Sequence, residues 1–294
     1  MKLLLLGGNG QVGRELRRSL KGLGELQVAT RQGAGSDLLA DFDAPDALED
    51  LVRRVAPDVV VNAAAYTAVD RAEAEPDGAF RVNAAAPAAL ARACAGEGAL
   101  LVHYSTDYVF DGTGSRPYRE EDPTAPLGVY GASKLAGEQA IRDSGARHAI
   151  LRTAWVYAAH GSNFLRTMLR LGGERDELGV VADQVGAPTP AHFIANATAE
   201  IVRQGVDASG TWHLTAAGQA SWHEFARAIF EQAHAAGRLP RVPRVRAIGT
   251  SDYPTPARRP AYSVLDSSRL RADFGIAPPP WRQGLQDVIG QLAD

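Results

Sequence analysis

The first half of the chain alternates short, almost wholly apolar runs with longer amphipathic stretches. The apolar runs lie at Leu3–Leu6, Leu26–Ala29, Val59–Val61, Leu100–His103 and Ala149–Leu151. The stretches between them have helical spacing and lie at Gln11–Leu23, Ala47–Val55, Gly78–Ala95 and Gly131–Asp143. Strands that are apolar along their whole length are buried on both faces, and strands that alternate with helices form parallel sheets. The pattern therefore predicts an α/β fold with a doubly wound parallel sheet.

A glycine-rich turn, Gly7-Gly8-Asn9-Gly10-Gln11-Val12-Gly13, follows the first strand and opens the first helix. At this place in a doubly wound fold, a dinucleotide pyrophosphate lies on the helix-terminal N–H groups, and a Cβ would block its approach. A tight strand-to-helix turn also uses glycine, but this context favours a Rossmann-type dinucleotide site. Its candidate residues are Gly7, Gly10, Gln11, Val12 and Gly13.

The second strand ends at Ala29-Thr30-Arg31, where many dinucleotide-binding folds carry an acid for the ribose hydroxyls. No carboxylate is available there, so Arg31 either meets a 2′-phosphate or lies in solvent at the strand end. Farther on, Asp41 and Phe42 either bracket the adenine, or Asp41 only caps the following helix. The missing acid favours NADPH, with NADH also accepted, because an exposed ion pair is worth only ~0–1 kcal/mol.

Tyr130 and Lys134 stand one helical turn apart on one face of a predicted helix. A phenol is a poor acid at neutral pH, and a nearby ammonium lowers its pKa by stabilising the phenolate. Tyr-x-x-x-Lys also occurs by chance on helix surfaces.

Upstream, Ser105 and Thr106 leave the fourth strand at its carboxyl end, where a hydroxyl either donates to a substrate oxygen or satisfies backbone groups. Gathered on one sheet edge with the glycine turn, these groups favour catalysis, with Thr106 as the substrate contact.

The second half has a looser rhythm. Further helices and strands are expected at Asn163–Leu171, Gly179–Val181, Pro190–Arg203, Thr211–Thr215, Ser221–Ala236 and Trp281–Leu292, with proline-marked turns before the last of them. The length of 294 residues allows one large domain or two modest ones. We expect residues 1–155 to bind NADP(H), with residues 180–215 returning to that domain, and residues 156–294 to form mainly a smaller substrate-binding lobe.

Composition excludes several classes of function. The chain has 31 basic and 34 acidic residues, a net charge of −3, and no long basic run, which argues against nucleic acid as a partner. Cys94 is the only cysteine and no Cys/His cluster has zinc spacing, so a reducing compartment and a metal-free protein fit best. The first apolar run stops at Gly7, and no run approaches the ~18 residues of a membrane span. We expect a cytoplasmic protein, with a homodimer as one option.

Four motifs together resemble the extended short-chain dehydrogenase/reductases: Gly7–Gly13, Asn62–Asp70, Ser105–Gly112 and Tyr130–Lys134. Within that superfamily, Asp183–Thr189 and Arg258–Asp266 resemble the dTDP-4-dehydrorhamnose reductase family. The resemblance covers nearly the whole chain, and the motifs occur in the family's order and spacing. It implies that NADPH reduces the 4-keto group of dTDP-4-dehydro-6-deoxy-L-mannose to give dTDP-L-rhamnose, a precursor of lipopolysaccharide and O-antigen.

The resemblance also implies a role for each motif residue. Tyr130 would donate the proton, Lys134 would be its partner and Thr106 would hold the reacting oxygen. The cofactor would lie against Gly10, Gln11 and Val12, with its adenine at Asp41 and Phe42, and against Ala63, Ala64, Ala65, Tyr66, Thr67 and Tyr104. The substrate would contact Val69, Thr106, Asp107, Tyr130 and Trp155, with Asn163 and Arg259 at its diphosphate. Tyr66 departs from the family, in which histidine is expected. The alternative to a substrate contact is that Trp155 is a core residue and that Arg259 is a surface residue.

Two rival functions use the same fold. A nucleotide-sugar 4,6-dehydratase or epimerase recycles a tightly held NAD, and dehydratase relatives carry Asp-Glu after the threonine. Here Tyr108 follows Asp107, which argues against dehydration. A non-catalytic regulatory subunit would have lost members of the catalytic set, whereas Thr106, Tyr130 and Lys134 are all present.

Overall fold

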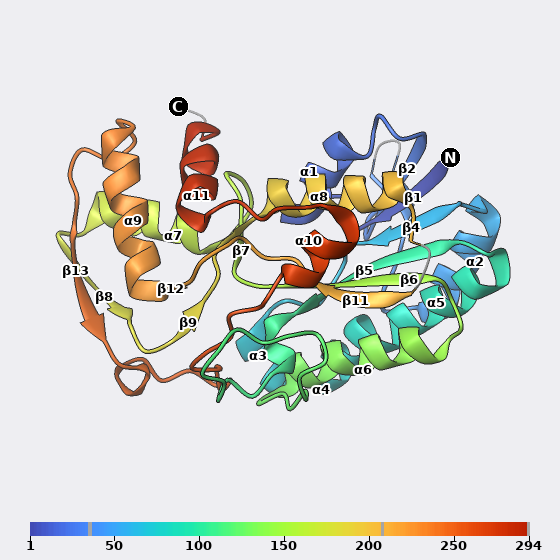
Figure 1. The fold of residues 1–294 in the computed structure, drawn as a ribbon, viewed down its shortest axis with the longest axis horizontal. Helices are drawn as coiled ribbons and strands as arrows, with labels where there is room; N and C mark the ends of the chain where they lie inside the picture. The colour runs from blue at the N-terminus through green and yellow to red at the C-terminus, as the bar shows by residue number, and fades with distance from the viewer. Residues whose placement is uncertain (35–36, 207–208, 293–294) are drawn as a thin grey trace.

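A seven-stranded parallel sheet forms the larger part of the molecule (Figure 1). The computed structural model describes residues 1–34, 37–206 and 209–292. The strand order is β11-β6-β5-β4-β1-β2-β3, and every pair is parallel. The strands are β1 (Lys2–Leu6), β2 (Glu25–Thr30), β3 (Leu38–Leu39), β4 (Val59–Asn62), β5 (Leu100–Thr106), β6 (His148–Thr153) and β11 (Gly210–His213). The predicted doubly wound sheet is confirmed.

Helices cover both faces of this sheet. On one face lie α1 (Gln11–Ser19) and α8 (Ala191–Gln204), and on the other lie α2 (Pro45–Val55), α5 (Ala86–Glu97) and α6 (Val129–Asp143) (Figure 1). Successive side chains of a strand point to opposite faces, so Leu3 and Leu5 of β1 join the first core while Leu4 and Leu6 join the second. Burial on both faces explains why these strands are apolar throughout.

The long helix expected over residues 78–95 is divided. Short helices α3 (Val69–Ala74) and α4 (Pro76–Phe80) precede a π-helical turn at Arg81–Ala85, and α5 continues from Ala86. Pro87 lies in the first turn of α5, where its missing N–H and its ring disturb the regular hydrogen-bond pattern of the preceding turn. The turn places Asn83 in the interior, where its side chain bonds the backbone N–H and C=O of Tyr66.

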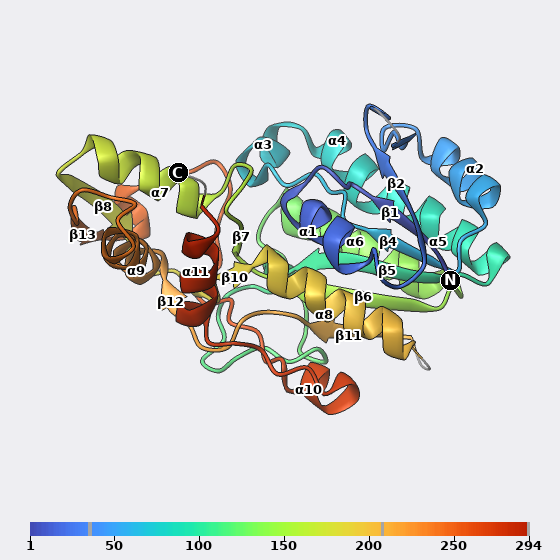
Figure 2. The same cartoon turned by 90° about the horizontal axis from the view of Figure 1, so that it is seen from above.

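The second half builds a separate aromatic core beside the carboxyl ends of the strands (Figure 2). The helices around that core are α7 (Phe164–Glu174), α9 (Trp222–Ala235) and α11 (Trp281–Gly290), whereas α10 (Ser268–Phe274) packs on the first core through Leu270 and Phe274. Its strand pairs are β7 (Val156–Tyr157) with β10 (Thr189–Pro190), β9 (Val185–Gly186) with β12 (Ala220–Ser221), and β8 (Glu177–Val181) with β13 (Arg244–Ile248). Strand β13 was not expected from the sequence.

Part of the second half returns to the large sheet. Strand β11 pairs with β6 at the edge of the sheet, and α8 packs beside α1. The domain boundary at residue 155 stays a prediction. Within the described ranges, no helix combines the length and the apolar composition needed to cross a membrane.

Candidate active site

A cavity of about 660 Å³ opens at the carboxyl ends of β1, β2, β4 and β5. Most of the residues expected at the cofactor line it: Gly7, Gly10, Gln11, Val12, Arg31, Phe42, Ala63, Ala64, Ala65, Tyr66, Thr67, Tyr104, Tyr130 and Lys134. Gly13 and Asp41 do not. Ser105, Thr30 and Thr153 also line it, although Thr30 and Thr153 were not proposed from the sequence.

The glycine turn brings backbone close to backbone. Gly7 has φ +77°, and a Cβ there would lie 2.6 Å from Ala64 N, so this position requires glycine. A Cβ on Gly13 would lie 2.1 Å from Gly7 O. Gly13 therefore lets α1 approach β1, and its expected cofactor contact stays a prediction. Gly10 is the N-cap of α1 and provides no side-chain cap, which leaves the first helical N–H groups available to an anion.

The far end of the cavity holds the residues expected near the adenosine. Phe42 is buried there, and Thr30 Oγ1 is buried without a hydrogen-bond partner. Arg31 is largely exposed and its guanidinium pairs with Asp43 at 2.8 Å. Asp41 accepts a hydrogen bond from Asp43 N at 3.0 Å and lies outside the cavity lining. The N-cap of α2 is Ala44, so Asp41 shapes the turn before that helix and does not cap it.

Thr106 and Tyr130 meet where β5 and α6 converge. Thr106 ends β5, accepts a hydrogen bond from Tyr108 N at 3.2 Å and donates one to Asp107 Oδ1 at 3.0 Å. Burial raises the pKa of Tyr130 to about 12, and a hydrogen bond with Thr106 acts in the opposite direction. The Tyr108 ring meets the Tyr130 ring edge to face at 5.6 Å between centroids. Tyr130 is thus held as a protonated phenol at neutral pH.

Lys134 lines the cavity from the same face of α6 as Tyr130. Its Nζ donates to Tyr104 O at 2.6 Å, and burial lowers its pKa to about 8 while Glu138 opposes that change. The lysine was expected to lower the pKa of Tyr130. The structure does not show this, because burial dominates at Tyr130 and Lys134 is directed to the backbone of β5.

The residues expected at the substrate come from three segments. Val69 and Tyr130 share a narrow cleft with Arg258 and Pro260. Arg259 pairs with Asp70 at 2.8 Å, a partner that no sequence motif indicated. Asp107 is buried, and its Oδ2 accepts a 2.6 Å hydrogen bond from Ser263. Burial raises the pKa of the Asp107 carboxyl to about 6, although hydrogen bonds from Ser263 and Thr106 oppose this.

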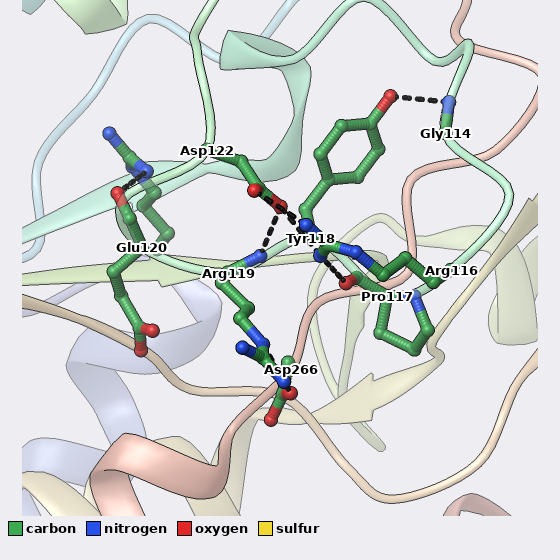
Figure 3. A network of polar contacts seen from close by, with 9 residues as sticks. Gly114, Arg116, Pro117, Tyr118, Arg119, Glu120, Asp122 and Asp266 are labelled. Carbon is green, nitrogen blue, oxygen red and sulfur yellow. Dashed lines mark hydrogen bonds and ion pairs between the residues drawn. The ribbon is translucent and has the colours of Figure 1, made fainter.

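A polar network fixes the loop that joins β5 to α6 (Figure 3). Arg116 makes two hydrogen bonds of 2.9 and 2.8 Å to Asp122, and Arg119 pairs with Asp266 at 3.6 Å. Backbone bonds join Tyr118 to the same C-terminal segment, from its N–H to Val264 O at 2.8 Å and from Asp266 N to its C=O at 2.7 Å. The network therefore holds Ser263 beside Asp107.

Trp155 and Asn163 are not among the residues that line the cavity. Trp155 has φ +47° and its ring stacks on Trp222 with centroids 3.4 Å apart. Asn163 is the N-cap of α7 and donates to Gln11 Oε1 at 2.8 Å, which links the second half to the glycine turn. The amide of Asn163 also donates to two backbone oxygens, so its expected contact with the substrate diphosphate stays a prediction.

A glycine turn after the first strand, a tyrosine and lysine on one helix face and a hydroxyl at a neighbouring strand end define an extended short-chain dehydrogenase/reductase. The chain belongs to the RmlD substrate binding domain family, whose model matches residues 1–293. The family predicted from the sequence is confirmed.

Proteins of known name are similar in sequence to this chain over nearly its full length. The dTDP-4-dehydrorhamnose reductase of Burkholderia thailandensis is 52% identical over 304 residues, covering 99% of this chain and 100% of that protein. The enzyme of the same name from Escherichia coli (strain K12) is 45% identical over 295 residues, covering 99% and 98%. A crystal structure of dTDP-4-dehydrorhamnose reductase from Bacillus anthracis in complex with NADP has a TM-score of 0.91 and 34% identity, covering 99% and 100%.

Proposed function

We propose that this chain reduces the 4-keto group of dTDP-4-dehydro-6-deoxy-L-mannose with NADPH and releases dTDP-L-rhamnose. The observation that carries the proposal is the convergence of Thr106, Tyr130 and Lys134 with the glycine turn near one cavity. Relatives at 45% and 52% identity carry the name of this activity.

The cavity residues suit a dinucleotide. A Cβ at Gly7 would close the approach of the backbone, α1 begins with uncapped N–H groups, and the buried hydroxyls of Thr30 and Thr153 have no partner. Unpaired buried hydroxyls are costly unless a ligand bonds them. Bound NADPH supplies the hydride for carbon 4 of the sugar. The glycine turn would hold the pyrophosphate of the cofactor. Lys134, which lines the same cavity, would contact another part of the cofactor.

Tyr130 supplies the proton. Because its pKa lies near 12, the phenol is protonated at neutral pH and can donate to the oxygen on which negative charge develops. The Thr106 hydroxyl accepts from Tyr108 N and donates to Asp107, and it would turn its O–H from Asp107 to that oxygen when the substrate is bound. The Tyr108 ring fills the space beside Tyr130, where dehydratase relatives carry a second acid. This arrangement favours reduction over dehydration.

The substrate residues lie at the border of the two halves. The deoxysugar and its diphosphate would be faced by Val69, Asp107, Trp155 and Arg259.

We propose that the enzyme works in the cytoplasm, where the buried thiol of Cys94 stays reduced. A homodimer remains a prediction that sedimentation would test.

The decisive experiment is to incubate the protein with NADPH and the 4-keto-L-sugar nucleotide and to follow the loss of nicotinamide absorbance. We expect a stoichiometric loss and a product that co-elutes with dTDP-L-rhamnose. Oxidation of NADPH without the sugar, or no oxidation with it, would contradict the proposal.

A further inference from the structure

Three buried polar side chains form a chain of polar contacts that begins at Lys134 in the cavity lining. Asn62 ends β4, His103 lies on β5 and Lys134 lies on α6, and they are 1%, 0% and 2% exposed. Asn62 Nδ2 lies 3.0 Å from His103 Nδ1, and His103 Nε2 lies 3.3 Å from Lys134 Nζ. Asn62 and His103 have no role in the proposed reduction so far.

One backbone group sets the direction of these hydrogen bonds. Ala64 N donates to Asn62 Oδ1 at 3.1 Å, and a backbone N–H can only donate. The Asn62 amide group therefore presents its NH₂ to His103, and His103 Nδ1 must accept. A histidine whose Nδ1 accepts carries its proton on Nε2 when the ring is neutral.

The ring is neutral at the pH of the cytoplasm. Burial lowers the pKa of His103 well below its usual 6.5, and the charge of Lys134 adds to that effect. The single ring proton therefore points from Nε2 toward Lys134.

This proton affects the two forms of Lys134 differently. An ammonium has no lone pair, so one of its N–H groups would face the N–H of His103 at 3.3 Å. A neutral amine accepts that N–H, donates to Tyr104 O at 2.6 Å and keeps one N–H for the cavity. The amine therefore satisfies every group around it.

We propose that Asn62 and His103 are positioning residues for Lys134: Asn62 fixes the histidine tautomer, and the Nε2–H of His103 favours the neutral amine of Lys134. Neither residue touches the reacting atoms. Their effect on the enzyme is exerted through the protonation of Lys134.

Other charges near Lys134 act in known directions. Glu138, one turn later on α6, favours the ammonium, but its carboxylate is held by Arg152 of β6 and by Arg142. Asp107 acts on Tyr130 and raises its pKa, and Tyr130 in turn acts on Tyr108. Of the titratable side chains in the described ranges, His103 is the one that approaches Nζ from β5.

The functional consequence rests on the proposed reduction, whereas the tautomer and the titration of Lys134 do not. If turnover requires the ammonium beside the phenol, activity falls as Lys134 loses its proton near pH 8. Without the His103 N–H, the ammonium persists to higher pH, and the alkaline limb of kcat/KM moves upward.

Nuclear magnetic resonance can read both side chains without substrate. The chain has three lysines, Lys2, Lys21 and Lys134, so a sample labelled at lysine Cε gives a spectrum that can be assigned by a Lys134→Met variant. We expect one resonance, that of Lys134, to titrate at lower pH than the other two. Imidazole ¹⁵N shifts should show a proton on His103 Nε2 and none on Nδ1.

Two variants remove the proposed effect by different routes. Asn62→Leu removes the donor to His103 Nδ1, so the ring proton can move to Nδ1 and Nε2 can accept a hydrogen bond from the Lys134 ammonium. His103→Phe removes the Nε2–H and keeps an aromatic ring. Each should raise the titration midpoint of Lys134, and the alkaline limb of kcat/KM, by about one pH unit. His148→Phe makes the same change at a buried histidine of the neighbouring strand and should leave the midpoint in place.

A proton on His103 Nδ1 in the unaltered protein would overturn the proposal, and this result needs no variant to fold. An unchanged Lys134 midpoint in both variants would also overturn it. Correct titrations in a protein that does not oxidise NADPH with the sugar would refute the proposed function and leave this inference standing.

Discussion

The two halves of the molecule hold their functional residues in different ways. In the first half, most residues proposed for the cofactor follow strands that pair in continuous register, such as Leu101–Thr106 of β5 with His148–Thr153 of β6. In the second half, short pairs such as β9 with β12 carry two residues each, and an aromatic core fixes the arrangement. The first half therefore places its residues through backbone geometry, and the second through side-chain packing.

One ion pair from each half shows how burial changes the role of charge. Glu138 and Arg152 of the first half are 0% and 2% exposed and form hydrogen bonds of 2.9 and 2.7 Å. Arg170 and Glu174 of α7 pair at 3.0 Å but are 61% and 54% exposed. A buried pair that loses one partner leaves a charge in the interior, whereas an exposed one is solvated. Removing one charge from the Glu138–Arg152 pair should therefore cost far more than removing one from the Arg170–Glu174 pair.

The largest effect expected is on catalysis in the first half. Tyr130→Phe keeps the ring and removes the proton donor, so kcat should fall ~10²–10⁴-fold while NADPH still binds. Steady-state kinetics and a fluorescence titration with NADPH would measure the two quantities. Near-normal turnover would show that another group donates the proton and that Tyr130 is not the general acid.

The next effect compares the stability of the two halves. Burial alone would raise the pKa of Glu138, but its bonds to Arg152 lower it below its usual value, so the residue is ionised at neutral pH. Glu138→Gln should reduce the free energy of unfolding by ~3–5 kcal/mol, because it leaves Arg152 buried without its counter-charge. Glu174→Gln, the matched change on α7, should cost less than ~0.5 kcal/mol. Equal losses in urea titrations would remove the distinction between the halves.

A smaller effect tests whether packing in the second half positions the substrate. Trp222→Ala removes the ring that stacks on Trp155 and should raise the KM for the sugar nucleotide up to ~10-fold, with kcat less affected. Trp212→Ala removes a tryptophan that packs on Phe274 of α10 instead and serves as the control. If both variants change KM equally, the stack has no special role at the substrate.

The smallest effect concerns cofactor choice. Arg31 is 79% exposed and already pairs with Asp43, so Arg31→Ala should narrow the preference for NADPH over NADH by no more than ~5-fold, chiefly through the KM for NADPH. Ratios of kcat/KM for the two cofactors would measure this. An unchanged ratio would assign the reading of the 2′-phosphate to another residue.

The sequence predicted the first half well because each of its signals is local. A buried parallel strand is apolar throughout, and the glycine turn and the Tyr130–Lys134 spacing lie within single segments. The strands, the family and the lining of the cavity by most predicted cofactor residues followed from these signals. Gly13 and Asp41 lie outside the cavity lining, so their cofactor contacts stay predictions, because sequence position cannot tell a residue that faces a ligand from one that supports its neighbour.

The tertiary structure decided what depends on distant segments. Asp70 with Arg259, Asp107 with Ser263 and Asn163 with Gln11 are separated by 189, 156 and 152 residues. No spacing rule connects such pairs, since the path of the chain between them determines their meeting. Burial likewise set the pKa of Tyr130 near 12 and that of Lys134 near 8, against the sequence-based expectation for the phenol. Composition and motif therefore determined the chemistry this chain carries, and packing determined the protonation states in which it is held.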